Sequence, residues 1–201
     1  MEQLDIRKTK TYVLSLHDQN NNRRKDIEEH LKTLDVENWQ FFDAIDVRGK
    51  LPYWVGCGLS HRECLVGAEY PCIVYEDDVI STSWFRPIVE CTNDAILYLG
   101  LSQWGTSSGT SQLHGTEFSV YSDELSVVKH MVSAHAIYYP NREIAMKFSD
   151  GIVRCMLEHV RPFDEHYALM QTKEKTLCLN QPLFYQNDPK TKHYTNIEVQ
   201  L

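Results

Sequence analysis

The residues most able to do chemistry form one uninterrupted run, Glu76, Asp77 and Asp78. They directly follow residues 72–75, a short apolar run rich in β-branched side chains, which predicts a strand buried on both faces. A buried strand cannot hold three unpaired carboxylates, so we expect the acids at its C-terminal end. Open α/β sheets bind their ligands at that edge.

Three adjacent carboxylates repel one another, and a divalent cation is a common means of relieving that repulsion. The functional interpretation is therefore a site for a hard metal ion and a phosphate-bearing substrate. The alternative is a solvated acidic turn after a strand, which is a frequent feature of proteins. The abrupt change from strand to acids is compatible with both.

Length and charge limit the classes of protein that fit. The 201 residues are enough for one domain with a full core, which we expect to span 1–201. A net charge of −8 argues against a dedicated nucleic-acid-binding protein. We see neither a secretion signal nor an apolar run that could cross a membrane, so we expect a cytoplasmic protein.

Cysteine usage fits the same expectation. Six cysteines without a secretion signal favour reduced thiols over a disulfide framework. Three cysteines and a histidine could form a zinc site, but their spacing matches no common zinc pattern. These residues are Cys57, His61, Cys64 and Cys72.

Strands and helices are predicted to alternate in the first part of the chain, as in an α/β unit. We expect a helix from Gly56 through Ala68, with Ser60 in its first turn, and a strand over 39–45. An earlier strand and helix are expected over 11–16 and 24–34.

The later part is predicted to be richer in antiparallel strands, which together give a three-layer α/β domain with a central mixed sheet. The expected elements are a helix over 84–91, strands over 94–99, 117–121, 127–131 and 134–139, a helix that is capped by Asn141 and ends near 150–151, and a strand pair within 177–185. The Ser-, Thr- and Gly-rich segment 103–115 is interpreted as a lid or a plain linker, and Trp104 within it as a sugar-stacking or a core residue.

Several segments, in order, resemble glycosyltransferase family 25, the lipooligosaccharide and procollagen galactosyltransferase type. The most specific are Gly56–His61, similar to the Gly-Cys-x-x-Ser-His signature of that family, and Ile73–Asp78, similar to its Glu-Asp-Asp strand end. The other matching segments are Tyr12–Leu16 with Arg23-Arg24, Phe42–Asp46, Ala136–Tyr138, Asp164 and Gln181–Gln186.

The resemblance implies a GT-A fold, which is a Rossmann-like nucleotide-binding half merged with an acceptor-binding half. It implies inverting transfer of a hexose, galactose or glucose, from a UDP-sugar to a hydroxyl acceptor, with Mn²⁺ or Mg²⁺ as cofactor. The acceptor would be a glycan, a lipid-linked glycan or a protein hydroxyl, as in lipopolysaccharide biosynthesis. Asp78 and Glu76 would hold the metal, Asp78 as the direct ligand and Glu76 directly, through water or in a structural role, and Asp77 would belong to the metal–diphosphate site.

Further roles follow from the resemblance together with residue chemistry. Arg23 and Arg24 carry planar donors suited to phosphate, or they are a solvated helix start. Ser60 and His61 are expected to face the same cleft, where His61 would contact the donor or the metal, or else is a structural histidine. Asp164, with Glu165 second, is the candidate base that removes the acceptor proton; either residue is otherwise a helix cap.

Two other classes of function remain open. The first strand ends Leu-Ser-Leu where the family has Asn, and this departure motivates a catalytically inactive module that binds a sugar or nucleotide sugar. A different metal enzyme, such as a phosphohydrolase, would use the same acids, although the sequence has no hydrolase nucleophile motif.

Overall fold

The computed structural model describes residues 1–17, 22–101 and 116–186. Its helices are α1 (Arg23–Thr33), α2 (Tyr53–Gly67), α3 (Arg142–Ser149), α4 (Ile152–Glu158) and α5 (Phe163–Met170). Its strands are β1 (Glu2–Asp5), β2 (Lys10–Ser15), β3 (Trp39–Asp43), β4 (Cys72–Glu76), β5 (Val79–Ser81), β6 (Ile88–Cys91), β7 (Ile96–Tyr98), β8 (Glu117–Val120), β9 (Leu125–Lys129), β10 (Ala136–Tyr139), β11 (Thr176–Leu179) and β12 (Phe184–Gln186).

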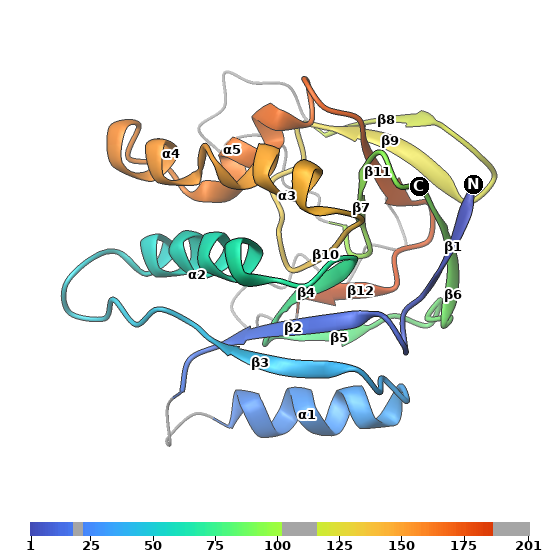
Figure 1. Ribbon diagram of the computed structural model, residues 1–201, viewed down its shortest axis with the longest axis horizontal. Helices are drawn as coiled ribbons and strands as arrows, with labels where there is room; N and C mark the ends of the chain where they lie inside the picture. Colours follow the sequence, from blue (N-terminus) through green and yellow to red (C-terminus); the bar gives the residue numbers. More distant parts are fainter. Residues whose placement is uncertain (18–21, 102–115, 187–201) are drawn as a thin grey trace.

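The predicted α/β architecture with a central mixed sheet is confirmed. Eight strands of the described chain form this sheet in the order β3-β2-β4-β10-β7-β11-β9-β8. Helix α1 lies on one face, and helices α2 to α5 lie on the other (Figure 1). Two small sheets, β1-β6 and β12-β5, complete the fold.

The first three strands of the large sheet are parallel, with β2 between β3 and β4. The connection through α1 leads to one neighbour of β2, and the connection through α2 leads to the other neighbour. Helices α1 and α2 cover opposite faces of the sheet (Figure 1). The order in which strands are added therefore switches from one side of β2 to the other. Such a switch point leaves a crevice outside the carboxyl ends of the strands.

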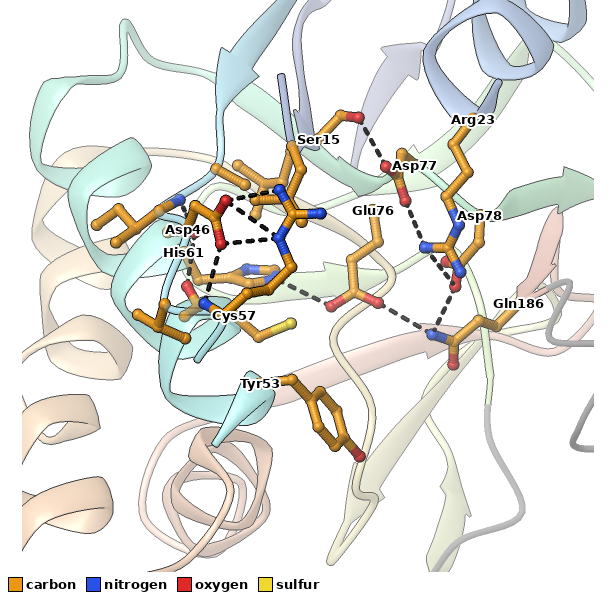
Figure 2. Close-up of a pocket in the computed structure, with 18 residues that line it drawn as sticks. Ser15, Arg23, Asp46, Tyr53, Cys57, His61, Glu76, Asp77, Asp78 and Gln186 are labelled. Atoms are coloured by element: carbon orange, nitrogen blue, oxygen red, sulfur yellow. Dashed lines mark hydrogen bonds and ion pairs between the residues drawn. The ribbon is translucent and has the colours of Figure 1, made fainter. Parts of the chain in front are cut away.

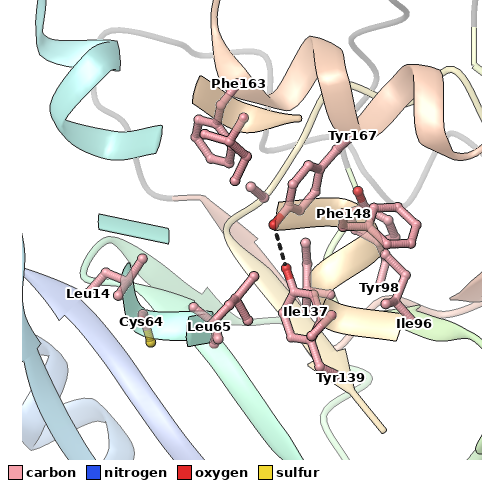
Figure 3. Packing of buried hydrophobic residues seen from close by; sticks show 14 of the residues in the cluster. Leu14, Cys64, Leu65, Ile96, Tyr98, Ile137, Tyr139, Phe148, Phe163 and Tyr167 are labelled. Atoms are coloured by element: carbon pink, nitrogen blue, oxygen red, sulfur yellow. Dashed lines mark hydrogen bonds between the residues drawn. The ribbon is translucent and has the colours of Figure 1, made fainter. Parts of the chain in front are cut away.

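Apolar side chains from both faces of this sheet build the core. On the face of α2 to α5, Leu65, Phe148 and Tyr167 pack against strand residues (Figure 3). On the face of α1, Ile27 and Leu31 are buried in a second cluster. The sheet therefore lies between two apolar layers.

Most of the predicted elements lie close to the observed ones, including the antiparallel hairpin β8-β9. The helix cap is also confirmed, because the Asn141 side chain accepts a hydrogen bond from the Ile144 amide at 3.0 Å. The predicted helix over 84–91 is wrong. Residues 88–91 form strand β6, which pairs with β1 at the start of the chain.

The start of α2 was also misplaced. The helix begins at Tyr53, after Pro52, so Ser60 lies in its interior and not in its first turn. Segment 103–115 and Trp104 lie outside the described residues. No helix within the described ranges is both long and apolar enough to cross a membrane.

Candidate active site at the carboxyl edge of the parallel strands

A cavity of about 480 Å³, hereafter the main pocket, lies at the carboxyl ends of β2, β3 and β4. This volume is within the usual range for small-molecule sites. The main pocket is therefore at the switch point of the sheet, where the sequence predicted the acids to emerge. Its lining includes Ser15, Arg23, Asp46, Arg48, Tyr53, Cys57, Ser60, His61, Glu76, Asp77, Asp78 and Gln186 (Figure 2).

Asp77 is held from the neighbouring strand and from α1. Ser15 Oγ donates to Asp77 Oδ2 at 2.6 Å, and Arg23 Nη1 donates to Asp77 Oδ1 at 2.8 Å. The same Arg23 nitrogen lies 3.8 Å from Asp78 Oδ2. Half of the Arg23 side chain is exposed, so a cation is present at the rim of the acidic edge.

Glu76 and Asp78 share a hydrogen-bond donor from the far end of the chain. Gln186 Nε2 donates to Glu76 Oε2 at 3.1 Å and to Asp78 Oδ2 at 3.2 Å (Figure 2). His61 Nε2 lies 3.1 Å from the other oxygen of Glu76, and it donates because a carboxylate only accepts. Burial would raise the pKa of Glu76, but the hydrogen bond and charge of His61 lower it.

Asp78 is the least satisfied acid of the three. Its Oδ1 atom is buried and has no hydrogen-bond partner within the described part of the chain. Burial, followed by repulsion from Glu76, raises the pKa of Asp78 to about 7. A positive charge beside this carboxylate would therefore stabilise its ionised form.

Helix α2 supports the opposite wall of the main pocket through close packing. A side chain at Gly56 would meet Ile45 O at 2.7 Å, so glycine allows the loop after β3 to approach the helix. Ser60 Oγ donates to Gly56 O at 2.6 Å and accepts from the Ile45 amide at 2.8 Å. Ser60 therefore faces the predicted cleft, but its hydroxyl is used to position the loop.

That loop contributes an ion pair at the rim of the main pocket. Arg48 Nε donates to Asp46 Oδ1 at 3.0 Å, and Arg48 Nη2 donates to Asp46 Oδ2 at 2.6 Å. The hydrogen bonds from Arg48 lower the pKa of Asp46 to about 2. Asp46 is therefore an acceptor at neutral pH, at the end of the strand next to β2.

A smaller cavity of about 160 Å³, hereafter the side pocket, adjoins the main pocket. Tyr53, Cys57, Glu76 and Gln186 line both. Asp164, at the start of α5, lines only the side pocket. Burial, followed by repulsion from Glu76, raises the pKa of Asp164 to about 7.

Two of the predicted site residues lie elsewhere. Arg24 Nη2 donates to Ser15 O at 2.7 Å and also pairs with Asp43, and the guanidinium lies 4.7 Å from the centre of the Phe41 ring. Glu165 pairs with Arg161 at 3.0 Å. Neither Arg24 nor Glu165 lines the two pockets, because both are engaged in local ion pairs.

Other lining residues were not predicted as site residues. Asp46, Arg48, Tyr53, Cys57 and Gln186 come from a loop, from a helix start and from the last described strand. Asp46, Cys57 and Gln186 belong to segments noted for the family resemblance, and Cys57 was also named in the zinc set whose spacing matched no common pattern.

Chemistry and geometry give different indications about a metal. Carboxylate oxygens suit Mg²⁺ and Mn²⁺, and Mg²⁺ commonly uses one or two carboxylates together with substrate phosphates. The buried, unpartnered Asp78 Oδ1 fits such a ligand. Within the described ranges, no three His, Cys, Asp or Glu side chains are grouped as a metal site. All six cysteines are free thiols, as predicted, with Cys57 exposed and the other five buried.

No model of a known protein family matches the chain, and a search of curated proteins finds no match.

Proposed function

We propose that the protein is a metal-dependent glycosyltransferase that moves a hexose from a UDP-sugar to a hydroxyl acceptor with inversion. The main pocket at the switch point of a parallel sheet, bordered by Glu76, Asp77 and Asp78, carries this proposal. The resemblance to glycosyltransferase family 25 supplies the identity of the reaction, and a GT-A fold is part of the same proposal.

The donor would bind across the carboxyl ends of β2, β3 and β4. The Asp46 carboxylate would accept hydrogen bonds from the hydroxyls of the ribose. An acidic residue near this edge binds the ribose in other doubly wound folds. Arg23 is half exposed beside the acids and would donate to the diphosphate. Gln186 and His61 would hold Glu76 in one orientation.

Asp78 and Glu76 would hold Mn²⁺ or Mg²⁺. The cation would neutralise the charge that develops on the diphosphate leaving group.

Asp164 would act as the base in the transfer step. Its carboxylate takes the proton of the acceptor hydroxyl while the acceptor oxygen bonds to the anomeric carbon. The bond from that carbon to the diphosphate breaks, and UDP leaves with the electron pair. A pKa near 7 suits a base that works at neutral pH.

One observation favours the alternative, an inactive module that binds a nucleotide sugar. Each acid already accepts a hydrogen bond from a side chain of this protein, from Ser15, His61 or Gln186. Such a module would bind UDP and show no turnover with any acceptor.

Release of UDP from UDP-galactose and UDP-glucose tests the proposal. We expect release that requires Mn²⁺ or Mg²⁺ and that falls by about 100-fold or more in Asp78→Ala, since metal-assisted charge stabilisation contributes several kcal/mol. Asp94→Ala is the control, because Asp94 forms a surface pair with Lys175 and should leave release unchanged. Full activity in Asp78→Ala would exclude the site, and binding without release would favour the inactive module.

A further inference from the structure

The side pocket has the position and size of a second substrate subsite. It shares one wall with the main pocket, formed by Tyr53 and Cys57 one turn apart on α2. Tyr53 is 80% exposed, and Figure 2 shows its ring beside Cys57. At about 160 Å³ the cavity is below the usual range for drug-sized ligands, so it suits one ring rather than a nucleotide.

One atom of the side pocket lacks a partner that a ligand could supply. Asp164 Oδ1 is buried and has no hydrogen bond to any group in the described ranges. A buried carboxylate oxygen without a donor is unfavourable, and native proteins rarely leave one so. A hydroxyl donor from a bound molecule would satisfy it.

The walls of the side pocket combine apolar surface with hydrogen-bonding groups. Val132, Ala134, Pro162 and Phe163 supply the apolar surface. The charged residues among those that line it are acids alone, Glu76 and Asp164. This mixture matches a sugar ring, which has C–H faces and hydroxyl donors. The same two acids would repel an anionic ligand.

We propose that the side pocket is the acceptor subsite and that it takes one uncharged sugar ring whose hydroxyl donates to Asp164. The inference rests on the proposed function and narrows its acceptor to a glycan that ends in a neutral sugar. Tyr53 and Cys57, which line both pockets, would lie where the acceptor ring meets the donor. An acceptor ring that carries a carboxylate or a phosphate is excluded.

Saturation-transfer NMR with simple glycosides tests the inference without turnover. Methyl β-galactoside, methyl β-glucoside and methyl β-glucuronide are offered singly, with and without UDP and Mg²⁺. The glucoside and glucuronide differ only in a carboxylate at C6, so they form a matched pair. We expect saturation transfer to a neutral glycoside and none to the glucuronide. Absence of binding by both neutral glycosides, or equal binding of the glucuronide, would overturn the inference.

A substitution locates the binding. Val132→Phe should fill the side pocket and abolish saturation transfer to the glycoside. Val120→Phe makes the same change on exposed strand β8, outside both pockets, and should leave the signal intact. An unchanged signal in Val132→Phe would also overturn the inference. If that variant does not fold, the wild-type comparison of glucoside with glucuronide decides alone.

The melting temperature with UDP and Mn²⁺ is measured in parallel. A rise with nucleotide but no glycoside binding means that the acceptor subsite is wrong and the donor site stands. Glycoside binding without any nucleotide effect means that the proposed transferase is wrong and the sugar subsite stands.

Discussion

Two groups of buried polar side chains differ in how completely they are hydrogen bonded. In the core, Tyr139 donates to Tyr167 at 3.1 Å (Figure 3), and Gln171 Nε2 donates to Tyr98 at 3.1 Å. Gln171 also exchanges two hydrogen bonds with the backbone of Met131. Each of these side chains therefore has a partner within the protein.

The carboxylates that line the two pockets are less completely hydrogen bonded. Asp78 and Asp164 each retain a buried oxygen without a partner in the described chain, and burial raises the pKa of both. A saturated network stabilises the fold, whereas an unsaturated one costs stability and leaves capacity for a ligand. On the proposed account the core cluster is structural and the acids form the functional cluster, and this difference can be tested by disrupting each.

The largest expected effect on stability is in the core. Gln171→Ala removes three hydrogen bonds and leaves a void, so we expect the free energy of unfolding to fall by about 3 kcal/mol. Gln186→Ala removes an amide from the acidic edge and should cost only about 1 kcal/mol. Urea denaturation measures both. Equal losses of unfolding free energy in the two variants would contradict the difference drawn between the core cluster and the acids.

Asp164→Asn should act in the opposite direction. The pKa of Asp164 is raised from 3.8 to about 7, so between those pH values the folded protein holds a proton that the unfolded chain has released. The free energy of unfolding of the wild type therefore falls as pH rises, and it levels off above pH 7. The full shift corresponds to about 4 kcal/mol, and partial solvation reduces this, so we expect Asp164→Asn to gain about 2 kcal/mol at pH 8.

At pH 4 the gain in Asp164→Asn should be much smaller, because the folded carboxyl is then protonated and the unfolded one, with a pKa of 3.8, is only about half ionised. Thermal denaturation at the two pH values measures the difference. Glu165→Gln is the matched control on the next residue, whose carboxylate pairs with Arg161. It should lower the melting temperature slightly at pH 8, because it breaks that ion pair, and it should not raise it. A loss of stability at pH 8 in Asp164→Asn would contradict the assignment of an unfavourable buried charge.

Tyr167→Phe should have an effect on stability as small as that of Gln186→Ala. The change removes one hydroxyl that accepts from Tyr139, and the ring remains, so we expect a loss of about 1 kcal/mol. Release of UDP should be unaffected, since Tyr167 lines neither pocket. A fall in UDP release without a fall in stability would show that the core cluster also serves the reaction.

Local patterns predicted the parts of the fold that depend on neighbouring residues. The abrupt end of β4 at Glu76 and the Asn141 cap are of this kind, because their signals lie within a few residues. Residues 88–91 were misassigned because their partner strand is β1, more than 80 residues away in the chain. The start of α2 was misassigned because interior glycines usually oppose a helix. Here Gly56 is required by contact with Ile45.

The candidate site was predicted only where residues are close in sequence. Glu76, Asp77 and Asp78 are consecutive, so their proximity needed no fold. Gln186 reaches two of them across more than 100 residues, and no local pattern reveals such an approach. Arg24 illustrates the reverse case. It neighbours Arg23, but the helical turn directs it to Asp43 instead of the main pocket.

The melting temperature across a panel of nucleotides and nucleotide sugars, with and without Mn²⁺, tests the central claim most directly. A ligand that binds only the folded state at about 100 times its dissociation constant adds about 2.7 kcal/mol to the free energy of unfolding. We predict a rise with Mn²⁺ and a uridine nucleotide together, absent in Asp78→Ala. No rise with any nucleotide, or an equal rise in Asp78→Ala, would contradict a donor site at Glu76, Asp77 and Asp78.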